Sequence, residues 1–142
     1  MPDHQEHVLG TVDGIEIVLR ALRCTDEGVT VELYGRANAL TEQLDATFQA
    51  AWDEWEPVAI DAKRRGVRAP DPPTQPGTRL SDIPMTLSDD AGTAYEWRGS
   101  QAAGTGTEWD ALRHFAPPPP PEATLLTVAI DGADARPYSM SL

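Results

Sequence analysis

Residues 85–97, with the sequence M-T-L-S-D-D-A-G-T-A-Y-E-W, constrain the fold of this chain more than any other stretch. Apolar side chains alternate with small or polar ones on both sides of a D-D-A-G turn signal. A period of two is typical of a strand with one buried face, and Asp and Gly tolerate the positive φ values of tight turns. The segment therefore predicts a β-hairpin whose turn is formed by residues 89–92.

The same alternation recurs along the chain, so a mainly β fold is expected. Further strands are predicted at residues 7–12, 15–24, 29–36, 109–115, 123–130 and 138–142. Asp13-Gly14 and residues 25–28 supply the turns between the first three of these strands. Within residues 15–24 the apolar positions change face, which predicts a bulge near Arg20 or a strand covered on both sides.

One segment has the period of a helix. Apolar residues from Leu40 to Trp55 recur at intervals of three and four residues, which predicts an amphipathic helix. Asn38 or Thr41 can cap its start, and Pro57 should end or kink it because proline lacks an N–H group. We expect a helical segment over residues 41–65, interrupted near Pro57.

Proline and glycine mark the connections. Residues 66–80 contain four prolines and predict an extended connection across the surface. Residues 117–121 are five consecutive prolines and predict polyproline II, either as a rigid connection or as a ligand for an aromatic groove. The glycine-rich residues 99–107 predict a flexible loop, and residues 1–6 a loose tail.

Composition limits the classes of partner. The 142 residues fit about one domain with its own core. A formal net charge of −12 disfavours nucleic acid and anionic membranes but is compatible with a basic protein surface. The single cysteine, Cys24, excludes an intrachain disulfide. Because signal-peptide and membrane-spanning patterns are absent, we expect a cytoplasmic protein.

Three segments carry a resemblance to known proteins: L-S-D-D-A-G-T-A-Y at 87–95, H-F-A-P at 114–117 and E-A-T-L-L-T-V-A-I at 122–130. Together with residues 15–36, this pattern resembles small uncharacterised immunoglobulin-like β-sandwich proteins of high-GC bacteria. The resemblance covers about half of the chain. It implies a sandwich fold, and it implies no activity, cofactor or catalytic residue.

We therefore predict that residues 1–142 form a single domain, an immunoglobulin-like antiparallel β-sandwich of about seven or eight strands. Residues 41–65 would be a helical insertion between sandwich strands. The residues expected in or near the core are Leu33, Leu87, Tyr95, Trp97, Phe115, Leu125 and Val128.

Residues capable of metal binding or catalysis are present, but none belongs to a complete motif. The candidates are His4, His7, Cys24, Ser81, Ser88, Asp89, Asp90, Gly92, Ser100 and His114. The aspartates lack the other ligands of a calcium loop, two histidines fall short of a closed metal site, and the serines have no nucleophile-elbow context. Cys24 is expected to be packed in its strand. We predict no metal, cofactor or catalytic residue.

The predicted helix carries the one candidate interaction surface. Trp52 and Trp55 either seal the helix onto the sandwich or belong to a protein interface, where tryptophan is enriched. Asp53, Glu54 and Glu56 would surround such an interface and favour a basic partner.

The function expected from these features is a non-enzymatic structural or protein-interaction module. The chain would act as a subunit of a larger assembly or as a homo-oligomer, without nucleic acid or membrane as a partner. One alternative is a small-ligand module with a cleft between helix and sheet, lined by Trp52, Trp55 and Trp109. A second is an unrecognised hydrolase that uses His114.

Overall fold

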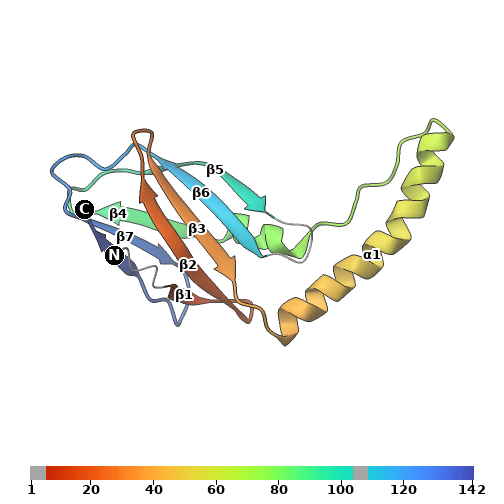
Figure 1. Ribbon diagram of the computed structural model, residues 1–142, viewed down its shortest axis with the longest axis horizontal. Helices are drawn as coiled ribbons and strands as arrows, with labels where there is room; N and C mark the ends of the chain where they lie inside the picture. The colour runs from red at the N-terminus through yellow and green to blue at the C-terminus, as the bar shows by residue number, and fades with distance from the viewer. Residues whose placement is uncertain (1–5, 104–108) are drawn as a thin grey trace.

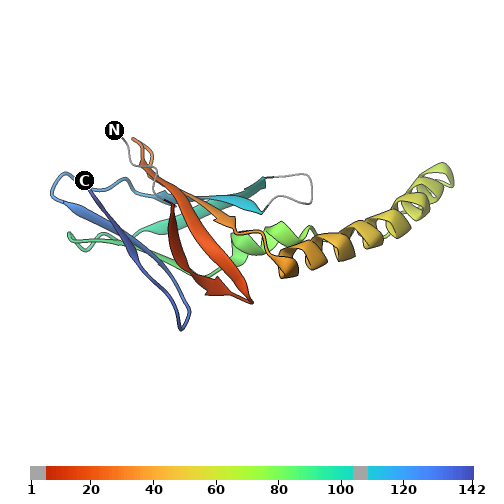
Figure 2. The ribbon, with the colours of Figure 1, turned by 60° about the horizontal axis from the view of Figure 1, so that its bottom comes forward.

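Two antiparallel sheets pack against each other and one long helix projects from them (Figure 1, Figure 2). The computed structural model describes residues 6–103 and 109–142. The elements in these ranges are β1 (His7–Val12), β2 (Ile15–Cys24), β3 (Val29–Gly35), α1 (Ala39–Arg64), η1 (Pro76–Thr78), α2 (Arg79–Asp82), β4 (Met85–Asp89), β5 (Glu96–Ala103), β6 (Asp110–Ala116), β7 (Leu125–Ile130) and β8 (Tyr138–Ser141).

The mainly β architecture is confirmed. The larger sheet has the strand order β1-β2-β3-β6-β5 and the smaller sheet has the order β4-β7-β8. Alternate side chains of both sheets meet in one shared core, among them Leu9, Ile17, Leu33, Leu126 and Val128. β7 is the central strand of the smaller sheet and β8 its edge, as predicted for residues 123–130 and 138–142.

The predicted hairpin over residues 85–97 is wrong. β4 pairs with β7 in the smaller sheet, whereas β5 pairs with β6 in the larger one, so the D-D-A-G segment joins two sheets. Its local chemistry is still that of a turn: Gly92 has a φ of 77°. Asp89 accepts hydrogen bonds from the backbone of Ala91 and Thr93, at 2.9 and 3.1 Å, and from the Tyr95 hydroxyl at 2.6 Å. A turn signal alone does not decide which strands pair.

Two of the predicted core residues are wrong, because Trp97 is 59% and Leu125 is 40% exposed. Trp97 lies on the edge strand β5, where the register shifts before Gly99, and its indole N–H donates to Ser100 Oγ at 3.0 Å. Leu125 begins the exposed alternate set of β7. The other predicted core residues are confirmed, with Tyr95 half-buried: Leu33, Leu87, Tyr95, Phe115 and Val128.

The strand over residues 15–24 contains the predicted bulge. Its pairing with β3 shifts between Leu19 and Ala21, so the residue between them, Arg20, is the extra one. A second expectation for this strand is wrong: Cys24 is exposed, because it is the last residue of β2 and the chain turns there. The predicted loop at 99–107 is also wrong in part, since β5 continues to Ala103 and residues 104–108 lie outside the described ranges.

The proline-rich connection ends in two short helices that the sequence patterns did not predict. Residues 68–75 belong to no helix or strand, but η1 and α2 follow and bury Leu80 between the sheets. Arg113 of β6 is only 5% exposed, and its Nη2 donates to the Leu80 carbonyl at 2.7 Å. Burial lowers the pKa of Arg113, while the charge of Asp82 acts to raise it. Arg113 therefore holds α2 in the core with a charge-assisted hydrogen bond.

Candidate functional site

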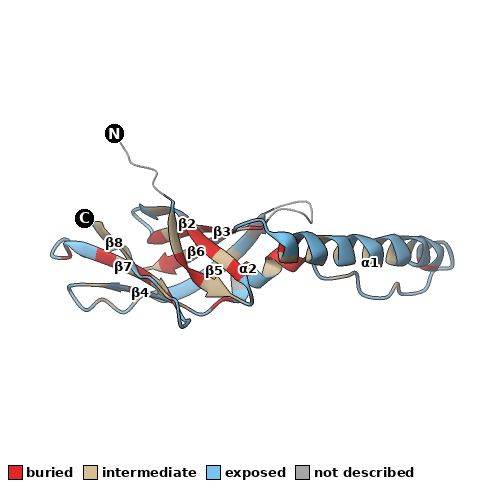
Figure 3. Cartoon of the chain, turned by 90° about the horizontal axis from the view of Figure 1, so that it is seen from below, coloured by how far each residue is buried: buried red, intermediate tan, exposed pale blue. Residues whose placement is uncertain are grey.

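Helix α1 forms an arm that leaves the sheets and points into solvent. At about 1.5 Å per residue, its 26 residues span about 39 Å. Only Thr41 and Ala62 are buried along the whole helix, and Figure 3 shows the contrast with the strands, which carry most of the buried positions. We call α1 and the following residues 66–75 the arm.

The root of the arm is tied to the body by its own cap. Asn38 and Thr41 form a reciprocal capping box, so both residues proposed from the sequence take part. The Asn38 amide also donates to the Gly14 carbonyl at 3.0 Å. One turn further on, Trp109 Nε1 donates to Asp45 Oδ1 at 3.0 Å. These bonds join α1 to the β1–β2 turn and to the start of β6, and they set its direction.

The far end of the arm turns back along itself. Gly66 takes a φ of 66°, and the amide of Val67 donates to the Ala62 carbonyl at 3.0 Å, as in a Schellman cap. Residues 66–75 then return beside α1 (Figure 1, Figure 3). Trp55 Nε1 donates to the Pro70 carbonyl at 2.8 Å, which fastens this proline strap to the helix.

The two tryptophans of the predicted surface lie on the strap side of α1. Their ring centroids are 4.9 Å apart, and Phe48 lies 6.0 Å from Trp52. Both tryptophans are half-buried, although α1 does not rest on either sheet beyond its root (Figure 1). Trp55 joins the helix to its own strap, Trp52 packs beside Trp55, and the opposite face of the helix is exposed.

Pro57 lies inside α1, where the sequence predicted an interruption. The helix runs through it without a break and curves along its length (Figure 1). Because proline has no N–H, the Asp53 carbonyl receives no hydrogen bond from position 57. A shallow groove of about 370 Å³ lies there, lined by Asp53, Glu56, Pro57, Ile60, Asp61 and Arg64.

Charge changes sign along this outer face. Asp53, Glu54 and Glu56 are exposed. Past the groove, four of the eleven basic residues of the chain lie within six positions, 63–68. Arg65 pairs with Asp61 at 3.5 Å, whereas Lys63 and Arg64 make no ion pair with any other residue that the structure describes. The arm therefore presents an acidic stem and a basic tip.

The remaining sequence candidates are spread over the body. His7 Nε2 lies 2.9 Å from the Arg136 carbonyl, and His114 Nδ1 lies 3.2 Å from Thr30 Oγ1. His4 lies outside the described residues. Partial burial raises the pKa of the Cys24 thiol, which disfavours its thiolate. Within residues 6–103 and 109–142, no group of three His, Cys, Asp or Glu side chains is placed to hold a metal ion.

The two aspartates of the D-D-A-G segment are occupied by donors of the protein itself. Partial desolvation acts to raise the pKa of Asp89, but hydrogen bonds from Thr93, Tyr95 and two backbone amides outweigh it and lower that pKa to about 2. Asp90 accepts hydrogen bonds from Thr124, which lower its pKa as well. Their role in this structure is to join β4 to the loops beside it.

Trp109 also borders a pocket at the root of the arm. The pocket has a volume of about 330 Å³, and its apolar lining includes Ile15, Ile17, Leu80 and Ile83. Arg79 and Asp82 lie at its edge. Neither Trp52 nor Trp55 lines it, so the three tryptophans of the predicted ligand cleft do not come together.

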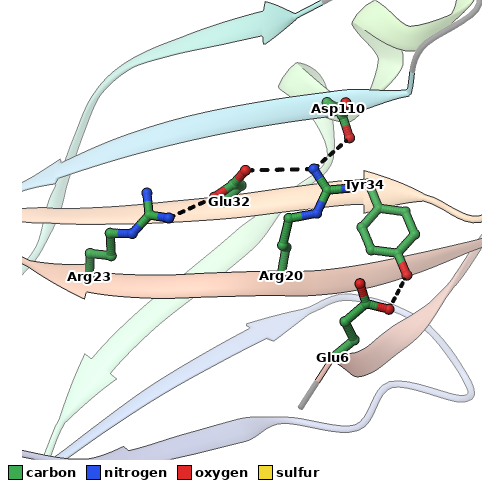
Figure 4. A network of polar contacts seen from close by, with 6 residues as sticks. All are labelled: Glu6, Arg20, Arg23, Glu32, Tyr34 and Asp110. Carbon is green, nitrogen blue, oxygen red and sulfur yellow. Dashed lines mark hydrogen bonds and ion pairs between the residues drawn. The ribbon is translucent and has the colours of Figure 1, made fainter. Parts of the chain in front are cut away.

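A charged network covers the outer face of the larger sheet (Figure 4). It contains Glu6, Arg20, Arg23, Glu32, Tyr34 and Asp110. Arg20 lies 3.2 Å from Asp110 and 3.6 Å from Glu32, and its guanidinium is 4.6 Å from the centre of the Tyr34 ring. The guanidinium groups of Arg20 and Arg23 are therefore both paired with carboxylates of the protein itself.

Within the described ranges, the structure has no helix that is both long enough and apolar enough to cross a bilayer. Comparison of the chain with protein-family models, with curated proteins and with solved structures found no match.

Proposed function

We propose that this chain is a non-enzymatic protein-interaction module whose arm is the docking element. The observation that carries the proposal is the exposure of a 26-residue helix in which only Thr41 and Ala62 are buried. Its outer face combines exposed Ile60, 47% accessible, with carboxylates and guanidinium groups. An apolar centre with a charged rim is the anatomy of a protein interface.

The body would serve as the scaffold that holds the arm in one direction. In this proposal the scaffold is immunoglobulin-like, and the protein acts in the cytoplasm as part of an assembly. The rigid capping and the Trp109–Asp45 hydrogen bond support the scaffold role, because a docking element fixed in advance loses less conformational entropy on binding.

Affinity capture from the source organism, with the immobilised full chain as bait, tests the proposal. A matched bait carries Ile60→Asp, which places a charge at the apolar centre without touching the strap. We expect at least one protein to be retained by the wild-type chain and lost with I60D. Equal retention by both baits, or no retention by either, would contradict the docking role of the arm.

A second candidate function is favoured by the root pocket. Its volume of about 330 Å³ and its apolar lining suit a small apolar ligand. Trp109 lies in the wall, so binding should quench or shift its fluorescence. A metabolite screen with Trp109→Phe as the control would test this function, and an unchanged wild-type spectrum with every compound would count against it.

A further inference from the structure

We propose that the partner of the arm is the arm of a second copy of this chain, paired with it in antiparallel orientation. The inference rests on the proposed docking function and adds the identity of the partner. Three observations carry it: the order of charges along α1, the position of Pro57 and Ile60 in the groove between them, and the exposure of this face.

The net charge of the outer half of α1 changes sign at Ala59, and the one carboxylate after this point, Asp61, is paired with Arg65 at 3.5 Å. The acidic set precedes Ala59 and the basic set follows it: Asp53, Glu54, Glu56, Lys63, Arg64 and Arg65. A helix reversed about this point places its basic set opposite the acidic set of the first helix. In a parallel pair, like charges would face each other, which is unfavourable.

The pairing also agrees with the helical positions. Asp53 and Arg64 are eleven residues apart, or about three turns, and both line the groove. On reversal, Asp53 of one copy lies opposite Arg64 of the other, and Pro57 lies opposite Ile60. These four of the six groove residues are therefore each used twice, as a two-fold symmetric interface requires.

The charged residues on the two flanks of the groove also pair when the second helix is reversed. At about 100° per residue, Glu56 and Lys63 fall on one flank, and Glu54 and Arg65 fall on the other. A two-fold axis perpendicular to the helix brings each flank beside the same flank of the second copy. Glu56 then faces Lys63, so this flank gains two reciprocal ion pairs. On the other flank, Glu54 faces Arg65, which is shared with Asp61 of its own helix.

The basic tip is available for such contacts. Lys63 and Arg64 have no carboxylate partner among the residues that the structure describes, and the one partner of Arg65 is the exposed Asp61. The groove adds a further acceptor, because Pro57 leaves the Asp53 carbonyl without its helix bond. A guanidinium from the second copy can donate to the carboxylate and to this carbonyl.

The interface has a small apolar centre and a large number of charges, so its strength should depend on salt. Screening is strong above about 0.1 M salt, where the Debye length is about 10 Å. We expect the purified full chain to form a dimer at about 0.02 M salt, with a dissociation constant that rises at least about tenfold at about 0.5 M salt. Sedimentation equilibrium over a range of concentrations measures both quantities.

Charge reversal tests the proposed contacts. The tip variant K63E/R64E/R65E should weaken dimerisation at least about tenfold, and so should the stem variant D53K/E54K/E56K. The control R23E/R36E/R98E makes the same change in net charge as the tip variant, but on the body, and should leave the dimer intact. An equimolar mixture of the tip and stem variants should restore a heterodimer. Circular dichroism confirms that each variant is folded.

Disulfide trapping tests the orientation. Two single-cysteine chains, C24S/D53C and C24S/R64C, are mixed and oxidised. The antiparallel pair predicts a disulfide between the two different chains, whereas a parallel pair predicts disulfides between identical chains, because the bond needs Cα atoms closer than about 7 Å.

The outcomes separate the two proposals. A salt-sensitive dimer that is lost in both charge variants and trapped as the mixed disulfide supports the inference. A chain that is monomeric under all conditions, a dimer indifferent to the charge variants, or trapping of identical chains overturns it. If capture from the source organism still depends on Ile60 in that case, the docking function stands with a different partner; if it does not, both proposals fail.

Discussion

The body and the arm of this protein are stabilised by different physical means. In the body, alternate side chains of two sheets share one core, and residues such as Leu33 and Val31 are completely buried. In the arm, a helix of 26 residues buries only two of them, and its order depends on caps, ring contacts and a strap. The comparison teaches that long-range packing fixes the body, whereas short-range contacts fix the arm and leave its surface for a partner.

The largest effect is expected from a cavity in the body. Leu33→Ala should lower the free energy of unfolding by about 2–5 kcal/mol, because it removes a fully buried side chain from the middle of β3. The matched control in the arm, Val58→Ala, is 53% exposed and should change it by no more than about 0.5 kcal/mol. Urea denaturation followed by circular dichroism measures both. Equal losses would contradict the distinction between the two regions.

The buried guanidinium gives the next effect. Arg113→Ala should cost about 2 kcal/mol, because it removes a charge-assisted hydrogen bond and leaves the Leu80 carbonyl unpaired in the core. Arg98→Ala is the exposed control and should be nearly neutral. Amide hydrogen exchange should increase around residues 76–83 in R113A. Unchanged exchange there would show that α2 does not depend on this bond.

The capping box is where the arm meets the body. Asn38→Ala should cost about 1 kcal/mol, since the amide of Thr41 loses its acceptor and Gly14 loses a donor. Asn38→Ser retains a capping oxygen and should recover about half of this loss. Helical circular dichroism and thermal unfolding provide the readout. Identical curves for the two variants would mean that tertiary contacts alone hold the root of the helix.

Lowering the pH should have a smaller effect on stability, and the residue responsible, Asp89, lies in the body. The pKa of Asp89 is about 2 in the folded chain, below the ordinary value of about 3.9. Asp89 therefore contributes stability that is fully present above about pH 4 and is lost as the pH falls towards 2. Asp89→Asn should show a weaker decline of the melting temperature in this window. Parallel curves for the variant and the wild type would contradict this assignment.

The smallest effect on global stability belongs to the strap. Trp55→Phe keeps the aromatic ring but removes the hydrogen bond to Pro70, so residues 66–75 should become more accessible to proteases. The free energy of unfolding should change by no more than about 0.5 kcal/mol, since the lost bond lies at an exposed site. Limited proteolysis tests it, with Trp97→Phe on the body as the control. Equal cleavage of the two variants would show that the strap is held by other contacts.

Local patterns in the sequence were sufficient for most elements. The alternation of β3 and β7, the capping by Asn38 and the helix end at Gly66 depend on residues close to one another in the chain. For the same reason the acidic residues of the arm could be named in advance as exposed. Backbone geometry and side-chain period depend on a few neighbouring residues, so they can be recognised in the sequence.

The partners of these elements were decided only by the tertiary structure. The segment around Gly92 is a turn, but it joins two sheets, because β4 pairs with β7 and β5 pairs with β6. Polarity alone predicts an exposed arginine and a buried tryptophan. In the structure, Arg113 is buried under α2 and Trp97 is exposed on an edge strand. Strand pairing and the direction of the arm arise from contacts between residues far apart in sequence. A short sequence pattern does not predict these contacts, because it contains only one of the two partners.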